Sequence, residues 1–231
     1  MGIGLTLYPR NPYAIQTEQK KDIHKHVTDW AEASQKPKCH GINNSTRFTV
    51  TIAICAVSQT EGELLIGLDV DGIYRVSGNL ATIQKLRFVV NQEEKLNLDD
   101  SQWEDIHVVT GALKMFFREL PEPLFPYCFF EQFVEAIKIQ EHDSQVKAIK
   151  DLVQRLPRPN YDTMKILFAH LQKIAAKENM NLMSSQSLGI VFGPTLLRPE
   201  KETGSMAIHM LYQNQLIELM LTEYTKIFSS D

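Results

Sequence analysis

The residues best suited to chemistry surround Arg75, which lies between two glycines in the run Gly72-Ile73-Tyr74-Arg75-Val76-Ser77-Gly78-Asn79. Gly72 and Gly78 permit backbone angles that other residues avoid, so this run is expected to form a loop. The guanidinium of arginine is permanently charged and presents a planar fork of donors that fits phosphate oxygens. An arginine held on such a loop could reach into another molecule and stabilise negative charge there.

Two further features bear on this loop. Asn79 is suited to cap a helix that begins at Leu80, because its side chain can accept from free backbone N–H groups. Asp69 and Asp71 precede the arginine. An alternative interpretation is therefore a surface turn in which Arg75 pairs with one of these two carboxylates.

A second group of charged residues lies downstream, where Lys114 and Arg118 are four residues apart. This spacing places them on one face of a helix, where like charges repel mildly. Gly111 lowers helix stability and leaves room for close approach of another backbone. With His107 these residues are expected to form a stripe distinct from the apolar face. The ordinary alternative is a solvated helix face.

From Leu80 onward the apolar residues recur at helical spacing, and no segment alternates with period two. We therefore predict an all-α fold. Asn160 is expected to cap one helix, Ser184 or Ser185 to open another that ends at Gly193-Pro194, and the last helix to run from about Met206 to Phe228. The residues assigned to the core by their helical spacing are Phe116, Phe133, Met164 and Phe168.

The first 66 residues have a different character. Apolar positions predict a helix over 13–33, followed by a polar loop over 36–47. Residues 48–66 form an apolar segment rich in β-branched side chains near its start, which suits a strand or a buried helix.

Composition excludes several functions. The 231 residues include 43% apolar residues, which is enough for a sizeable core, and carry a net charge of −4. The chain therefore lacks the basic field that nucleic-acid binding requires. Three cysteines without a short-spaced pair argue against a disulfide framework. No apolar run approaches the ~20 residues of a membrane helix. We expect a cytoplasmic protein.

Cofactor sites are also not indicated. His24, His26, Cys39 and His40 fit no closed zinc pattern, so no metal site is expected. A glycine-rich phosphate loop with a lysine is missing, so the chain itself is expected to bind no nucleotide.

Several motifs, in this order and spacing, resemble the RhoGAP domain family: the arginine run, Gly111 to Leu124, Asn181-Leu182-Met183 with Leu188 to Leu197, and Tyr212-Gln213-Asn214-Gln215. The resemblance extends from Gly67 to about Phe228. It implies a RhoGAP-like helical bundle at 67–231, preceded by an atypical N-terminal segment at 1–66. Within that segment, 48–66 either replaces the first helices of the domain or part of its core is lost.

The resemblance also implies a function and a set of site residues. Arg75 would be the arginine finger, with Gly72, Gly78 and Arg118 supporting its loop. Lys114, Asn214 and Ser187 would contact the GTPase. Ser187 departs from the asparagine common at that position, and a serine offers fewer donors.

The implied partner is a Rho-family GTPase in its GTP form, and a Rac-like GTPase is the one that the resemblance implies as preferred. GTP and Mg would be bound by this partner, and the chain would need no cofactor of its own. Membrane contact would be indirect, through the partner or other domains. Two alternatives remain open: a module that binds GTPases without accelerating hydrolysis, and a helical scaffold with no GTPase partner.

Overall fold

The computed structural model describes residues 68–91, 100–201 and 206–229. The predictions for 13–33, 36–47 and 48–66 lie outside these residues, as do the histidines and the cysteine considered as metal ligands. Among the described residues, every regular element is helical, which confirms the all-α prediction. The elements are α3 (Leu80–Asn91), η1 (Ser101–Trp103), α4 (Ile106–Glu119), η2 (Tyr127–Phe129), α5 (Phe130–Ile137), α6 (His142–Gln154), α7 (Arg158–Ala175), α8 (Glu178–Asn181), α9 (Ser185–Leu196), α10 (Met206–Thr222) and α11 (Tyr224–Phe228). No helix in the described ranges is long and apolar enough to cross a membrane.

Side-chain caps begin several helices. Asn79 Oδ1 accepts from the Thr82 amide at 3.1 Å, which confirms the predicted start of α3. At α9, the Ser184 hydroxyl accepts from the Ser187 amide at 3.1 Å, and the helix begins at Ser185 as expected.

Two predicted helix boundaries are wrong. α7 begins at Arg158, because proline is tolerated in a first helical turn and Pro157 and Pro159 do not delay it. Asn160 lies inside this helix, and its Nδ2 donates to the Leu124 carbonyl at 2.9 Å instead of capping. α9 continues through Pro194 to Leu196.

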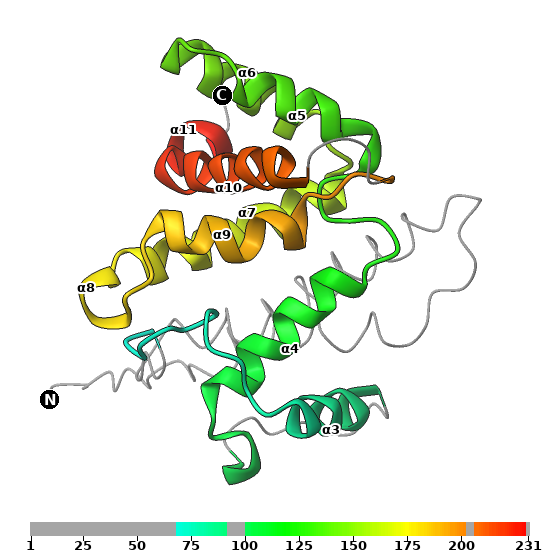
Figure 1. Ribbon diagram of the computed structural model, residues 1–231, viewed down its shortest axis with the longest axis vertical. Coiled ribbons are helices and arrows are strands. Elements are labelled where there is room, and N and C mark those ends of the chain that lie inside the picture. The colour runs from blue at the N-terminus through cyan, green and yellow to red at the C-terminus, as the bar shows by residue number, and fades with distance from the viewer. Residues whose placement is uncertain (1–67, 92–99, 202–205, 230–231) are drawn as a thin grey trace, which may run out of the picture.

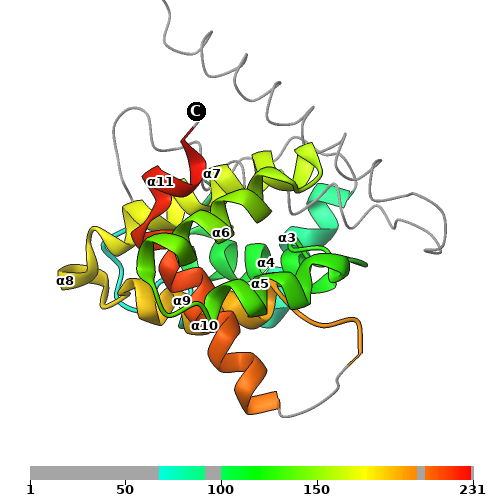
Figure 2. The ribbon, with the colours of Figure 1, turned by 90° about the horizontal axis from the view of Figure 1, so that it is seen from above.

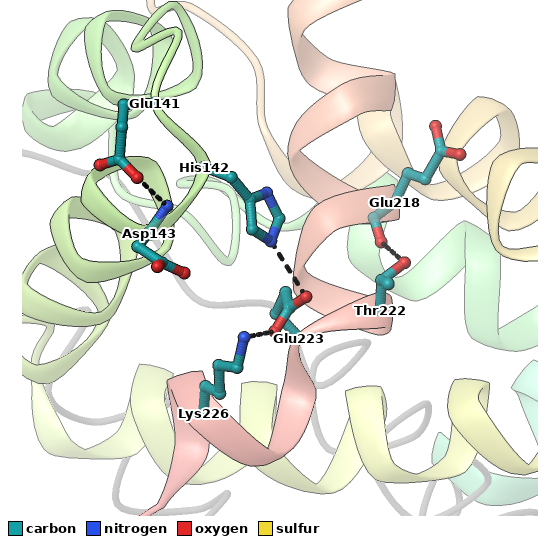
Figure 3. Close-up of polar contacts among 7 residues, drawn as sticks. All are labelled: Glu141, His142, Asp143, Glu218, Thr222, Glu223 and Lys226. Carbon is teal, nitrogen blue, oxygen red and sulfur yellow. Dashed lines mark hydrogen bonds and ion pairs between the residues drawn. The ribbon is translucent and has the colours of Figure 1, made fainter.

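The last predicted helix is divided at Glu223, which separates α10 from α11. Figure 3 shows the Glu223 carboxylate between two basic side chains, accepting from His142 Nε2 at 3.1 Å and from Lys226 Nζ at 2.8 Å. These contacts, Lys226 first and His142 second, lower the pKa of Glu223. At this break, Glu223 therefore links the C-terminal helices to the start of α6.

The helices pack around two apolar cores. α10 packs along α9 and α5, while α11 packs on α6 and α7 (Figure 1). The large core includes all four predicted residues, Phe116, Phe133, Met164 and Phe168, at 4% exposure or less, which confirms that assignment. A smaller core joins α3 to α4 and consists of Ile83, Leu86, Trp103, Val108, Val109 and Ala112. Figure 2 shows the first turns of α10 extending away from the other helices.

Residues 68–79, which we call the arginine loop, connect these cores. Leu68, Ile73 and Tyr74 are buried in the large core. A few residues later the chain enters α3, whose Ile83 belongs to the small core. In Figure 1 the cyan segment accordingly passes from beside α8 to α3. Arg75 is carried where the chain crosses from one core to the other.

Candidate functional site

A tight turn at Gly72 precedes the arginine. Gly72 has φ +67°, and its carbonyl accepts from the amides of both Arg75 and Val76 at 2.8 Å. A Cβ at this position would lie 2.7 Å from Val76 Cγ2. The left-handed backbone therefore favours glycine here, and the space available excludes a Cβ.

Tyr74 shares the left-handed conformation, with φ +67°, although it is not glycine. This backbone conformation costs about 1–2 kcal/mol for an ordinary residue. Its side chain is fully buried, and its ring meets the Phe192 ring edge-on with centroids 5.0 Å apart. The hydroxyl lies 2.8 Å from Nε2 of His170, which is buried in α7. The unusual backbone thus directs Tyr74 into the core.

Burial keeps both members of this pair neutral. It raises the pKa of the Tyr74 hydroxyl above its usual range. Burial, with a smaller effect from the charge on Lys173, lowers the pKa of His170 to about 4. At neutral pH the contact is therefore a hydrogen bond between uncharged groups.

Arg75 lies beside this buried tyrosine but points the other way. Its side chain is 52% exposed, and Nη2 is 3.1 Å from Oδ1 of Asp71, itself 66% exposed. Asp69 instead pairs with Lys177 at 2.7 Å. The structure therefore contains the Asp71 pairing considered as the alternative. Because exposed ion pairs are worth at most about 1 kcal/mol, this one leaves the guanidinium available to a stronger partner.

Asn181 ties the start of the arginine loop to the rest of the domain. It is fully buried, and its Nδ2 donates to the carbonyls of Leu68 and Ile174 at 2.7 and 2.8 Å. Its backbone carbonyl accepts from the Gly72 amide at 2.8 Å. Its Oδ1 accepts from the Met183 amide at 2.8 Å.

Two glycines allow close packing around α4. A Cβ on Gly78 would lie 2.5 Å from the backbone of His107, so the loop approaches the first turn of α4 directly. A Cβ on Gly111 would lie 2.7 Å from the side-chain tip of Ile83 in α3. Gly111 is buried against α3. The prediction that Gly111 belongs to a stripe distinct from the apolar face is therefore wrong, since its lack of a side chain serves contact between two helices.

Lys114 and Arg118 have different contacts. Lys114 Nζ donates to the backbone carbonyl of Tyr74, and burial together with the Arg118 charge lowers its pKa. Arg118 Nε donates to the Thr195 hydroxyl in α9 at 3.4 Å. Of these two residues, Lys114 thus forms a hydrogen bond to the arginine loop, whereas Arg118 links α4 to α9.

Ser187 and Asn214 lie on the adjacent helices α9 and α10. The Ser187 hydroxyl accepts from the Ser184 hydroxyl at 3.2 Å, within the helix cap. With its nitrogen placed to donate, the Asn214 amide reaches the carbonyls of Gly189 and Met210 at 3.2 and 3.1 Å. Asn214 therefore contributes to packing between the helices, and its predicted contact with a GTPase stays a prediction, as does that of Ser187.

Sequence reasoning missed Tyr74, His170 and Asn181 as individual site residues. One signal for His170 is its spacing, three residues after Leu167 and four before Ile174, which places it on the apolar face of α7. Its partner is 96 residues away in the sequence, and local pattern carries no information on that pairing.

Comparisons with known proteins agree on one family. The sequence model of the RhoGAP domain family matches residues 63–201 of this chain. Rho GTPase-activating protein 15 of Gallus gallus is 85% identical over 165 residues, covering 71% of this chain and 35% of that protein. Rho GTPase-activating protein 12 of Homo sapiens is 65% identical over 162 residues, covering 70% of this chain and 19% of that protein. The chain thus spans about a third or less of the length of these relatives.

Solved structures lead to the same family. The crystal structure of human Rho GTPase activating protein 15 matches with a TM-score of 0.73 and 74% identity, covering 77% of this chain and 83% of that one. The BH domain from GRAF, the GTPase regulator associated with focal adhesion kinase, matches with a TM-score of 0.69 and 34% identity, covering 81% and 97%. With the arginine loop and the helices that hold it, these matches show that the chain belongs to the RhoGAP domain family.

Proposed function

We propose that this chain accelerates GTP hydrolysis by a Rho-family small GTPase and does so by supplying Arg75 to the active site of its partner. The observation that carries the proposal is the contrast between two neighbouring residues. Tyr74 is fully buried and hydrogen-bonded, while the Arg75 side chain next to it is 52% exposed and held by one exposed ion pair. An arginine acting in trans requires a backbone held in place by buried contacts and an exposed guanidinium that can exchange its partner.

The chemistry follows from the charge that develops during hydrolysis. Negative charge accumulates on the phosphoryl oxygens in the transition state, and a small GTPase alone stabilises it poorly. A guanidinium placed beside these oxygens supplies the missing positive charge. For another small GTPase an arginine supplied in this way accelerates hydrolysis by about 10³–10⁵. The chain needs no general base, because the GTPase positions the attacking water.

The preferred partner is the GTP form of a Rho-family GTPase, with a Rac-type protein as the first candidate from the sequence resemblance. The partner would hold both GTP and Mg, so the chain would require no cofactor. Lys114, Ser187 and Asn214 are proposed to contribute to the GTPase-facing surface. Contact with a membrane would come through the partner, and the protein would act in the cytoplasm.

Single-turnover hydrolysis of GTP bound to Rho, Rac and Cdc42 tests this function. We expect Arg75→Ala to abolish acceleration but to leave binding to the GTP form largely intact, because the finger acts in the transition state. Arg75→Lys should also fail, since a point charge does not reproduce the planar fork.

Arg158→Ala is the matched control, because Arg158 is an exposed arginine that, like Arg75, forms an i,i+4 ion pair; its partner Asp162 is in the same helix, α7. Its acceleration should equal that of the unmodified chain. Near-normal acceleration by Arg75→Ala would overturn the proposed mechanism.

The two alternatives predict other results. A binding module without catalysis would retain GTP-loaded GTPase in a pull-down but leave hydrolysis unchanged. A scaffold would retain none of the three GTPases. The buried contacts that hold the arginine loop in place favour catalysis over binding without catalysis.

A further inference from the structure

We propose that the hydrogen bond between Tyr74 and His170 is a positioning device that sets the direction in which Arg75 leaves its loop. This inference rests on the proposed function, because it concerns how the same arginine is presented. It assigns a role to two buried residues that do not themselves contact the partner.

The backbone conformation of Tyr74 bears directly on the direction of Arg75. At φ +67° this residue occupies a conformation that L-residues with side chains rarely adopt. A rotation to the common region near −60° would swing the following residue, and thus the Cα of Arg75, to a new direction. Strained backbone next to a functional side chain persists when surrounding contacts over-determine it. The direction of Arg75 therefore depends on whatever holds Tyr74.

Tyr74 is held both at its side-chain hydroxyl and at its backbone carbonyl. Its hydroxyl is 2.8 Å from His170 Nε2 in α7, and its backbone carbonyl accepts from Lys114 Nζ in α4. The carbonyl belongs to the peptide unit that joins Tyr74 to Arg75. Two helices thus orient the peptide group that precedes the arginine.

Placing His170 in the core costs free energy. The histidine is 4% exposed, and its Nδ1 is buried without a hydrogen-bond partner among the described residues. Buried polar atoms are normally paired, and an unpaired one needs an explanation. An apolar side chain would fill this place without that cost. A hydrogen bond, unlike packing, is directional, so it can hold the Tyr74 ring at one depth and orientation.

Tyr74→Phe is the direct test, because it removes the hydroxyl and keeps the ring that packs on Phe192. The matched control is Tyr224→Phe in α11, where the hydroxyl donates to the Lys165 carbonyl at 3.2 Å. For each variant, single-turnover hydrolysis by a GTP-loaded Rho-family GTPase gives the maximal rate and the half-saturating concentration. We expect Tyr74→Phe to lower the maximal rate by about 3- to 10-fold, the scale of one lost hydrogen bond. Its half-saturating concentration should stay the same, and Tyr224→Phe should change neither value.

A second readout reports the arginine itself. Affinity for the GTPase bound to GDP and aluminium fluoride, relative to affinity for the GDP form, measures how well Arg75 meets transition-state charge. Tyr74→Phe should reduce this ratio of affinities. A variant that only loses stability has fewer folded molecules, but the folded ones would bind the two forms with an unchanged ratio of affinities.

His170→Leu completes the test. If the two residues act as one unit, the double variant Tyr74→Phe/His170→Leu should be no slower than the slower single variant. Should Tyr74→Phe fail to fold, a lowered maximal rate with an unchanged half-saturating concentration in His170→Leu decides in favour, and an unchanged rate decides against.

The failure of this inference is distinguishable from failure of the proposed function. If Arg75→Ala abolishes acceleration but Tyr74→Phe has the rate of Tyr224→Phe, the positioning role is overturned and the function stands. Multiplicative rate losses in the double variant would overturn it as well. If Arg75→Ala keeps its acceleration, the proposed function falls first.

Discussion

At the scale of single residues, Lys114 shows how a charged side chain can serve a loop. Burial lowers its pKa, and the positive charge of Arg118 lowers it further. The ammonium group is nevertheless directed at the carbonyl of Tyr74. A charged donor in a partly buried place forms a stronger bond than a neutral one. Its contribution is therefore expected in loop geometry as well as in any contact with a GTPase.

Lys114→Met tests this contribution, because methionine keeps most of the apolar stem and removes the donor. Hydrogen bonds to charged groups contribute about 1.5–3 kcal/mol, so we expect GTPase activation to slow by about ten-fold or more. Lys147→Met, which changes an exposed lysine on α6, is the control and should match the unmodified chain. If Lys114→Met lowers the melting temperature without changing the rate of GTPase activation, the role of Lys114 is purely structural.

Asn181 offers a sharper test, since exchanging one atom reverses its chemistry. In Asn181→Asp the Nδ2 donor becomes an oxygen that faces the carbonyls of Leu68 and Ile174. Two lost hydrogen bonds in a buried place cost about 1–3 kcal/mol each, and a buried charge adds to this.

Denaturant unfolding measures the effect of Asn181→Asp. We expect a loss of several kcal/mol, or about 2–6 from the hydrogen bonds alone. The control is Asn79→Asp, the same exchange at an exposed cap whose Oδ1 accepts from Thr82. Aspartate caps as well as asparagine and suits a helix N-terminus, so this variant should be neutral or slightly stabilised. Equal effects at the two positions would contradict the contacts assigned to Asn181.

At the scale of elements, the sequence was informative about periodic and local features. The core faces of the helices, the cap at Asn79 and the start of α9 after Ser184 follow from spacing and side-chain chemistry. The misplaced boundaries have local causes: prolines fit the first turn of α7, and α9 tolerates Pro194 inside it. What could not be predicted is which distant groups meet, because the partners of Tyr74 and Asn181 depend on the packing of whole helices.

The contact between the arginine loop and α4 gives an element-scale prediction based on two glycines. Alanine at Gly78 would place its Cβ 2.5 Å from the His107 backbone, which cannot move without shifting the start of α4. Alanine at Gly111 would meet the tip of the Ile83 side chain at 2.7 Å, and this tip can rotate. Alanine also favours a helix by about 1 kcal/mol over glycine.

We therefore expect Gly78→Ala to lower both the melting temperature and the rate of GTPase activation, and to do so more than Gly111→Ala. Overpacking against a rigid neighbour typically costs about 1–3 kcal/mol. Thermal unfolding and single-turnover hydrolysis on the two variants provide the comparison. If Gly111→Ala proves the more damaging, the α3–α4 contact is tighter than the loop contact and the ranking is wrong.

At the scale of the whole molecule, the arginine loop depends on both cores at once. Its residues Leu68, Ile73 and Tyr74 are buried with residues of α7 and α9, and the helix that follows it belongs to the α3–α4 core. A change that loosens either core should therefore reach Arg75. His170 is a titratable group through which pH can act on the larger core, since it is buried there and bonded to Tyr74.

The sign of this pH effect follows from the pKa of His170. Burial lowers that pKa from 6.5 to about 4 in the folded chain, so the unfolded chain binds the proton more readily. The free energy of unfolding therefore has its full value, with respect to this group, above pH 6.5, and it decreases as the pH falls toward 4. At about 1.4 kcal/mol per pKa unit, the loss attributable to this histidine is at most about 3 kcal/mol.

Free energies of unfolding between pH 7 and 4 test this expectation, with His170→Leu measured alongside the unmodified chain. Carboxylates titrate in both proteins, so the difference between the two curves isolates the histidine. The free energy of unfolding of the unmodified chain minus that of His170→Leu should be constant above pH 6.5 and fall as the pH approaches 4. Tyr74→Phe keeps the burial of His170 and should keep most of the pH dependence, because burial is the main cause of the lowered pKa. Parallel curves for His170→Leu and the unmodified chain would mean that His170 binds its proton as readily in the folded chain as in the unfolded one. Protonation of His170 would then not affect the arginine loop.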